Sequence, residues 1–204
     1  MDYLVIILFA YLIGSISFGI IIGWLNNQQD IRSLGTNNAG ASNTFLVVGP
    51  LAAVLTAVLD IAKGFIPAAI AWSIFKSEAV VGLVSLAVVA GHIWPVFFRF
   101  KGGKGVSTAT GALLFISWKV VLITFIIWAV LVVTWRYVTM CNVIAFLIIP
   151  LMGLFFGLPN ETIIFMIALA ALIIISHREN ITKYFHGEEK TIIEIIREKK
   201  EKKG

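Results

Sequence analysis

The chain has 204 residues, 59% of them hydrophobic and only 13% charged, with a net charge of +5 and a mean hydropathy of +0.97. Soluble domains carry about 25% charged residues, so this composition excludes a soluble globular fold, and the low charge excludes disorder. The single cysteine, Cys141, excludes a disulfide framework or a cysteine metal cluster. We therefore expect an all-α, polytopic integral membrane protein that forms one domain over residues 1–204.

The apolar stretches of the chain predict its membrane-spanning helices, because one crossing takes about 20 residues. These stretches cover residues 3–25, 45–75, 79–98, 106–135, 138–157 and 161–176. The stretch 106–135 is long enough for two helices, with a break at Trp118 and Lys119. The stretch 45–75 predicts one tilted or kinked helix, with Gly64 and Pro67 as its weak points.

Three polar segments, residues 26–44, 99–110 and the tail from residue 177, are expected to face one compartment. The chain then crosses the membrane seven times with its termini on opposite sides, although five or six crossings stay open because the segment 106–117 is short. The side of the polar segments collects most of the cations, and the other side has only Lys76 and Lys119. The positive-inside rule places the polar segments and the C-terminus in the cytoplasm.

The segment 35–44 combines glycines with hydrogen-bonding side chains at the entrance of a span. Glycine permits backbone conformations in which successive N–H groups converge on an anion, and Thr36, Asn38, Ser42 and Asn43 add side-chain donors. A helix that starts near Asn43 would direct its positive end to the same point. The segment predicts an anion site, with an ordinary turn and helix N-cap as the alternative.

A second segment, residues 91–108, contains three glycines and two lysines in five successive positions. These positions are Lys101, Gly102, Gly103, Lys104 and Gly105. A mobile backbone with fixed positive charge suits a phosphate monoester, which needs many donors and net positive charge. The segment is not a Walker A loop, because Lys104 is followed by glycine rather than by Ser or Thr. The alternative is a basic loop that only obeys the positive-inside rule.

His177 and Asn180 stand three residues apart at the end of the last apolar stretch, so on a continuing helix they share a face. His177 can serve as a general base or as a hydrogen-bond donor to phosphate. A structural histidine at a helix end is the alternative.

Asp60 and Lys63 show the same spacing inside an apolar stretch. Charges within a membrane are expensive and usually paired, so these two residues predict either a functional pair or a structural ion pair. The small residues of the segment 14–19 predict a close contact between helices.

The tail, residues 178–204, carries eight Lys and Arg residues interleaved with six Glu, a mixture that does not fit a nucleic-acid-binding arm. The isoleucines of residues 191–197 fall on one helical face, which suits a helix lying on a membrane surface. A solvated tail with a short helix is the alternative.

Together these segments resemble the bacterial acyl-phosphate:glycerol-3-phosphate acyltransferases, integral membrane enzymes of the PlsY type. The resemblance covers almost the whole chain, and the segment 91–106 is its most specific part. It implies a seven-span enzyme of the bacterial inner membrane with three cytoplasmic motifs. Such an enzyme transfers a fatty acyl group from acyl phosphate to the 1-hydroxyl of sn-glycerol 3-phosphate. The products are lysophosphatidate and inorganic phosphate, in the first step of phospholipid synthesis.

The resemblance also implies the site. We expect Lys104, His177 and Asn180 to be catalytic. Residues expected to bind the two substrates are Thr36, Asn38, Gly40, Asn43, Lys63, His92, Lys101, Gly102, Gly103 and Gly105. The segment 101–104 is assigned chiefly to glycerol 3-phosphate, and the residues between 36 and 43 chiefly to acyl phosphate. Because phosphate is a good leaving group, positioning and charge stabilisation suffice, and we expect no protein nucleophile, metal or cofactor.

The first motif departs from the family pattern at three positions. Thr36 stands in place of a serine, Asn37 in place of a glycine, and Leu46 where an arginine is expected. Since an apolar side chain cannot replace a phosphate-binding charge, either another cation substitutes, with Arg32 the nearest in sequence, or the chain is an altered paralogue. A transporter of a phosphorylated solute is a further alternative, although transporters bind near the bilayer midplane.

Overall fold

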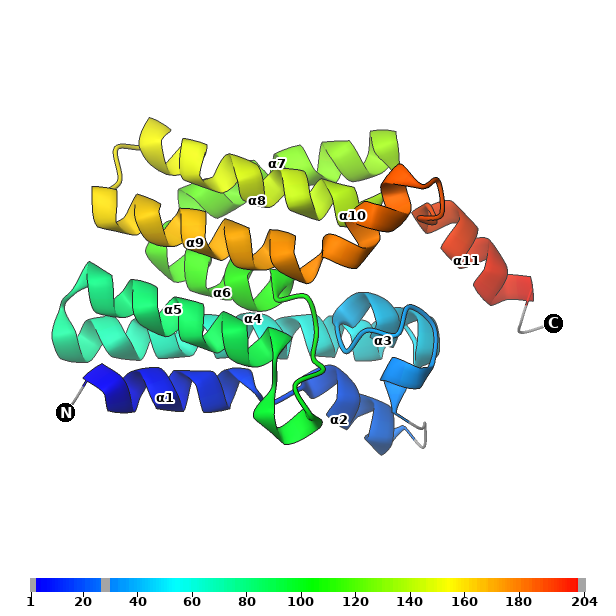
Figure 1. Cartoon of the computed structure of the whole chain (residues 1–204), viewed down its shortest axis with the longest axis horizontal. Helices are drawn as coiled ribbons and strands as arrows, with labels where there is room; N and C mark the ends of the chain where they lie inside the picture. Colours follow the sequence, from blue (N-terminus) through cyan, green and yellow to red (C-terminus); the bar gives the residue numbers. More distant parts are fainter. Residues whose placement is uncertain (1–2, 27–29, 202–204) are drawn as a thin grey trace.

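The computed structural model describes residues 3–26 and 30–201, which form α-helices and two short 3-10 turns without a strand (Figure 1). The α-helices are α1 (Tyr3–Gly14), α2 (Phe18–Leu25), α3 (Ala41–Val47), α4 (Pro50–Phe75), α5 (Glu78–Ile93), α6 (Val106–Ile116), α7 (Trp118–Trp135), α8 (Val138–Phe155), α9 (Asn160–Ser176), α10 (Arg178–Phe185) and α11 (Ile192–Glu201). The short turns are η1 (Ile31–Ser33) and η2 (Val96–Phe98). The all-α expectation is confirmed for the described residues.

The long helices lie side by side in one bundle, with α1 at one edge and α7 and α8 at the opposite edge (Figure 1). Helix α5 is central, because it packs on α1, α4, α6 and α9. Val84, Val88, Leu169 and Ile173 are fully buried in the core between these helices.

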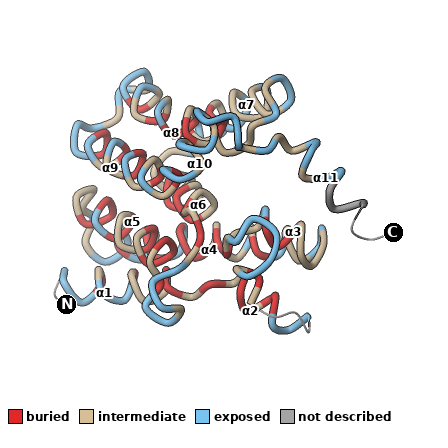
Figure 2. The backbone as a smooth tube through the Cα atoms, turned by 45° about the vertical axis from the view of Figure 1, so that its right-hand side comes forward, coloured by how far each residue is buried: buried red, intermediate tan, exposed pale blue. Residues whose placement is uncertain are grey.

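The outside of the bundle is apolar. Figure 2 shows that buried backbone lies toward the interior while exposed backbone lies at the edges of the molecule. Leu51, Val133 and Phe155 are 82%, 75% and 76% exposed. Exposing so many large apolar side chains to water would be costly, whereas lipid hydrocarbon solvates them without penalty. The exposed surface therefore fits a protein whose solvent is the bilayer.

By length and composition, five helical stretches of the described chain can cross a membrane: Tyr3–Leu25, Pro50–Phe75, Glu78–Phe98, Trp118–Trp135 and Val138–Phe155. A sixth is possible if α9 and α10, which meet at an angle of 59°, form one bent span. Helix α6 has 11 residues, which is short for a crossing. The count of seven is therefore not confirmed and stays a prediction.

The helix breaks differ in part from the expected ones. The break within residues 106–135 is confirmed, since α6 ends at Ile116 and Ser117 caps α7. The stretch 45–75 is divided at Gly49, whose φ of 146° suits only glycine and which precedes a proline at the first position of α4. Helix α4 continues through Gly64 and Pro67, so this part of the stretch forms one helix, and a kink at these two residues stays a prediction.

The small residues of the segment 14–19 do mediate close contacts. A methyl group on Gly14 would collide with the backbone of Val88 on α5, and one on Gly19 would collide with the backbone of Ala39. The same segment also interrupts the first span, since α1 ends at Gly14 and α2 begins at Phe18. This break was not predicted, because the stretch 3–25 is apolar almost throughout.

The three polar segments gather at one end of the bundle, as predicted. Figure 1 shows α2, α3, the α5–α6 connection and α10 at this end, while the α4–α5 and α8–α9 turns lie at the other. Helix α11 forms in the tail, and its first residue, Ile192, donates a backbone hydrogen bond of 3.0 Å to the carbonyl of Arg136. A helix in the tail is thus confirmed, whereas its position on a membrane surface stays a prediction.

Candidate active site

Arg32 joins the first two polar segments. Its Nε and Nη2 atoms bind the carboxylate of Asp30, at 2.9 and 2.5 Å. Its Nη1 atom donates to the carbonyl oxygens of Phe98, at 2.8 Å, and Lys101, at 2.6 Å. The hydrogen bond from Arg32 lowers the pKa of Asp30, which keeps this pair charged. In this arrangement Arg32 holds two loops together, and its substitution for the arginine expected at position 46 stays a prediction.

Asn43 organises the first glycine-rich segment. The side chain is fully buried, and its Nδ2 donates to the carbonyls of Ile31, at 2.6 Å, and Asn38, at 2.8 Å. Its Oδ1 accepts from the backbone N–H of Thr36 at 2.8 Å, and the Asn38 Oδ1 accepts from that of Gly40 at 2.9 Å. These amides shape the loop rather than face solvent, and α3 begins directly after it, close to the expected position.

The second glycine-rich segment lies against the end of α5. The N–H groups of Gly102 and Gly103 donate to the carbonyls of Ile93 and His92, each at 3.1 Å. A methyl group on Gly103 would collide with the imidazole of His92, which is buried. The two glycines therefore allow the loop to approach the helix end, and their N–H groups hold the loop in place.

Lys63 and His92 lie below this loop in a buried polar network. The Lys63 ammonium is 2.8 Å from the carboxylate of Asp60 and donates to the carbonyl of Ile16, at 2.7 Å, where the first span is broken. The His92 Nδ1 lies 3.5 Å from the same carboxylate and 3.1 Å from the hydroxyl of Thr108. The network joins α4, α5, α6 and the α1–α2 break, and it confirms that Asp60 and Lys63 form an ion pair.

Lys104 connects the second and third motifs. Its ammonium donates to the Oδ1 of Asn180, and its carbonyl oxygen accepts a hydrogen bond of 2.9 Å from the hydroxyl of Ser176. The Nδ2 of Asn180 in turn donates to both carboxylate oxygens of Glu189, at 3.0 Å each. Burial lowers the pKa of Lys104 to about 8, although the carboxylates of Glu189 and Glu179 oppose this shift. Lys104 is therefore charged at neutral pH but titrates in the alkaline range.

His177 stands at the junction of α9 and α10 and is 1% exposed. Its Nδ1 lies 2.8 Å from the carbonyl oxygen of Ile173, and since a carbonyl only accepts, Nδ1 carries the proton. In the neutral ring Nε2 is then a hydrogen-bond acceptor. The expectation of a continuing helix through Asn180 is wrong, because the axis bends by 59° at His177. Asn180 nevertheless contacts Lys104, and burial together with the nearby Lys104 charge lowers the pKa of His177 to about 4, so that its ring is neutral.

The structure thus brings the predicted residues together in two layers. Lys101, Lys104 and Asn180 lie at the end of the bundle where the three polar segments gather, which is called the loop end below. Lys63, His92 and Asn43 are buried and support the loops. No sequence pattern indicated Glu189, because its contact with Asn180 depends on how the tail folds back. In the described part of the chain, His, Cys, Asp and Glu side chains form no group of three that could hold a metal.

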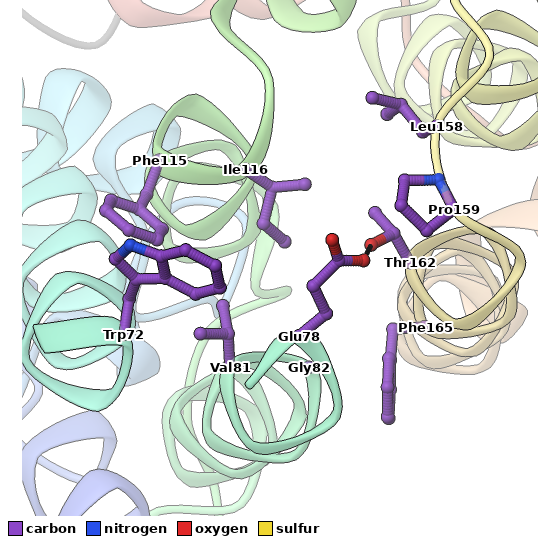
Figure 3. A pocket seen from close by; sticks show the side chains of 10 residues that line it. All are labelled: Trp72, Glu78, Val81, Gly82, Phe115, Ile116, Leu158, Pro159, Thr162 and Phe165. Atoms are coloured by element: carbon purple, nitrogen blue, oxygen red, sulfur yellow. Dashed lines mark hydrogen bonds between the residues drawn. The ribbon is translucent and has the colours of Figure 1, made fainter. Parts of the chain in front are cut away.

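A cavity of about 280 Å³ lies at the other end of the bundle (Figure 3). Its lining includes Trp72, Phe115, Pro159 and Glu78, whose carboxylate accepts a hydrogen bond of 2.5 Å from the hydroxyl of Thr162. No residue predicted for the site lines it. The cavity is therefore separate from the loops that carry the motifs.

The fold and the site define a multi-pass membrane protein with a cationic centre at one end of its helices, which is suited to a phosphorylated substrate. A family model described as glycerol-3-phosphate acyltransferase matches residues 4–187. The chain belongs to this family, and it is an acyltransferase of the membrane. The resemblance seen in the sequence is thereby confirmed, and the enzyme is favoured over a transporter.

Individual relatives agree with this assignment over nearly their full length. A glycerol-3-phosphate acyltransferase of Aquifex aeolicus (strain VF5) is 41% identical over 190 residues, which cover 93% of this chain and 98% of the relative. The corresponding enzyme of Ehrlichia canis (strain Jake) is 37% identical over the same shares.

Two solved structures are also similar to the chain. The crystal structure of PlsY (YgiH), an integral membrane glycerol 3-phosphate acyltransferase in its glycerol 3-phosphate form, has a TM-score of 0.89 at 40% identity. Its lysophosphatidic acid form has a TM-score of 0.87 at 39% identity. Both comparisons cover 95% of this chain and 98% of the other.

Proposed function

We propose that the chain transfers a fatty acyl group from acyl phosphate to the 1-hydroxyl of sn-glycerol 3-phosphate. The hydroxyl oxygen forms an ester bond with the acyl carbon, the bond from that carbon to the phosphate oxygen breaks, and the hydroxyl proton leaves on the released phosphate. The observation that carries the proposal is that the lysine- and glycine-rich loop contacts Arg32 through the carbonyl of Lys101, and contacts Asn180 and Ser176 through Lys104. The glycerol 3-phosphate and lysophosphatidic acid forms of the similar PlsY structure support the choice of acceptor and product.

Binding of the phosphates is assigned to the cations and N–H groups at the loop end. The Lys104 ammonium and the first N–H groups of α6, which begins two residues later, bind the phosphate of glycerol 3-phosphate. The exposed Lys101 adds positive charge at the entrance. The segment around Thr36, shaped by Asn38, Gly40 and Asn43, receives the acyl phosphate. The apolar faces of the spans receive the acyl chain.

His177 and Asn180 are assigned to orientation. Nε2 of His177 is the acceptor that aligns the attacking hydroxyl, because Nδ1 is committed to the carbonyl of Ile173. Asn180 holds Lys104 in place through its amide oxygen. Positioning and charge stabilisation together are enough for a reaction with a phosphate leaving group. Lys63 and His92 are assigned a supporting role, because they belong to the buried polar network against which the glycine-rich loop packs.

The loop end of the bundle is assigned to the cytoplasm of a bacterium, with the protein in its inner membrane, because most cations lie at this end. Cysteine labelling tests the orientation, since the native Cys141 is buried. Ser42→Cys and Lys76→Cys place exposed thiols at opposite ends of the bundle. A membrane-impermeant maleimide should label Lys76→Cys in intact spheroplasts and Ser42→Cys only after lysis. The reverse pattern would contradict the orientation.

The donor is tested by supplying the purified protein in lipid nanodiscs with radiolabelled glycerol 3-phosphate and one of three palmitoyl donors. Palmitoyl phosphate should give labelled lysophosphatidate, whereas palmitoyl-CoA and palmitoylated acyl carrier protein should not. Equal incorporation from palmitoyl-CoA would overturn the assignment of acyl phosphate as the donor.

A further inference from the structure

Glu189 belongs to the segment that joins α10 to α11, just beyond residue 187, where the match to the family model ends. Its carboxylate accepts two hydrogen bonds of 3.0 Å from the Nδ2 of Asn180. The Oδ1 of Asn180 accepts from the ammonium of Lys104. A tail carboxylate, the motif amide and the motif lysine therefore form one continuous hydrogen-bonded chain.

The carboxylate determines which way the Asn180 amide faces. An amide presents an acceptor at one end and donors at the other, and it can rotate to exchange them. An ionised carboxylate only accepts, so Glu189 holds the NH2 group and leaves the oxygen directed at Lys104. We propose that Glu189 is a positioning residue for the acyl transfer, which fixes the Asn180 amide so that its oxygen holds the Lys104 ammonium in the site. This inference rests on the proposed function.

The segment that carries Glu189 is anchored on both sides. Before it, the N–H of Glu188 donates to the carbonyl of Lys183 at 2.8 Å, which closes the turn after α10. After it, the N–H of Ile192 donates to the carbonyl of Arg136, the residue that follows the end of α7. The carboxylate is therefore held at Asn180 by backbone hydrogen bonds on either side.

The titratable groups that face Lys104 give the proposal its measurable consequence. Glu189 reaches it from the tail, Glu179 and Lys183 from α10, and His177 from the α9–α10 junction. Burial lowers the pKa of Lys104 to about 8, and Glu189 is the foremost group that opposes this shift. When the Glu189 charge is removed, the Lys104 ammonium loses its proton at lower pH. The Asn180 amide is then also free to rotate and to turn its NH2 group toward Lys104.

The test is the KM for glycerol 3-phosphate between pH 7 and 9.5, measured with palmitoyl phosphate for the wild-type chain and for Glu189→Gln. The matched control is Glu188→Gln, which removes the same charge from the exposed neighbouring residue. Phosphate monoesters lose their second proton near pH 6, so the substrate does not titrate in this range. Spontaneous hydrolysis of the donor is subtracted at each pH.

The pH at which KM begins to rise should be lower by about half a unit in Glu189→Gln, corresponding to a roughly threefold higher KM at pH 8.5. The control should follow the wild-type profile. Superimposable profiles of Glu189→Gln and wild type would overturn the proposal. So would a lower KM at every pH, because Glu189 would then compete with the substrate phosphate. If the wild-type chain itself forms no lysophosphatidate, the proposed function fails and this inference fails with it.

Discussion

The buried pair of Asp60 and Lys63 offers a quantitative test of how the site is supported. Both side chains are almost inaccessible, at 2% and 3% exposed, and they lie within a span. Replacing Lys63 by methionine keeps the length of the side chain but leaves the buried Asp60 carboxylate without its ammonium partner, with the imidazole of His92 3.5 Å away. It also leaves the carbonyl of Ile16 without the ammonium that it accepts from.

Breaking one partner of a buried ion pair costs about 3–5 kcal/mol, because the other charge is left uncompensated. We expect a destabilisation of this size for Lys63→Met. The double variant Asp60→Asn, Lys63→Met removes both charges, so only the hydrogen bonds and packing are lost, at about 1 kcal/mol for each hydrogen bond. The double variant should therefore be more stable than Lys63→Met alone, with a coupling of about 2–3 kcal/mol.

The free energies can be measured by unfolding the protein from mixed detergent micelles with sodium dodecyl sulfate, followed through its six tryptophans. The KM for glycerol 3-phosphate is measured in parallel on the folded fraction. A Lys63→Met variant that is destabilised by less than about 1 kcal/mol but binds glycerol 3-phosphate more than tenfold more weakly would refute this reasoning. Lys63 would then contact the substrate directly, as the resemblance implies.

Four other substitutions test separate parts of the account. Gly103→Ala should raise the KM for glycerol 3-phosphate about tenfold or more and lower the free energy of unfolding by about 1–3 kcal/mol, because the added methyl group meets the buried His92 ring and displaces the loop; an unchanged KM would contradict this. Lys104 has a pKa of about 8, so KM should rise above pH 8 as the ammonium loses its proton, and Lys104→Arg, if active, should flatten that rise because its guanidinium stays charged. Asn43→Ala removes three hydrogen bonds and should lower the free energy of unfolding by about 2–3 kcal/mol, read from the same detergent titration; a loss below 1 kcal/mol would contradict its structural role. Leu46→Arg should change the transfer rate less than threefold in the donor assay if the site works without the family arginine, whereas a large gain would indicate an altered paralogue.

Much of the architecture was predictable because hydrocarbon thickness and charge placement constrain a membrane chain strongly. The spans, the break before Trp118 and the gathering of three polar segments follow from such patterns. The break after Gly14 was not predictable, because its residues are small or apolar. The side chain that binds the carbonyl of Ile16 belongs to Lys63, which lies 47 positions away in the sequence.

The sequence pattern selected residues that the fold brings into contact, but it did not predict what each side chain binds. The motif pattern selected Lys104 and Asn180, which contact each other. The pattern could not indicate that the Asn43 side chain binds backbone groups of its own loop, because those hydrogen bonds depend on the folded path of the backbone. From the sequence, Arg32 was the nearest cation that could replace the arginine expected at position 46. In the structure its guanidinium joins two loops by donating to the carbonyls of Phe98 and Lys101. Pairings of this kind are set by tertiary structure, which leaves no local pattern.

The most direct test of the central claim is phosphate release by the protein in lipid nanodiscs, supplied with palmitoyl phosphate in the presence and absence of glycerol 3-phosphate. Lys104→Ala, checked for folding by its unfolding transition, is the matched control. The account predicts release that requires glycerol 3-phosphate and falls at least a hundredfold in the variant, since a buried charge that binds phosphate is worth about 3 kcal/mol. Release that does not depend on glycerol 3-phosphate, or that persists in Lys104→Ala, would contradict it.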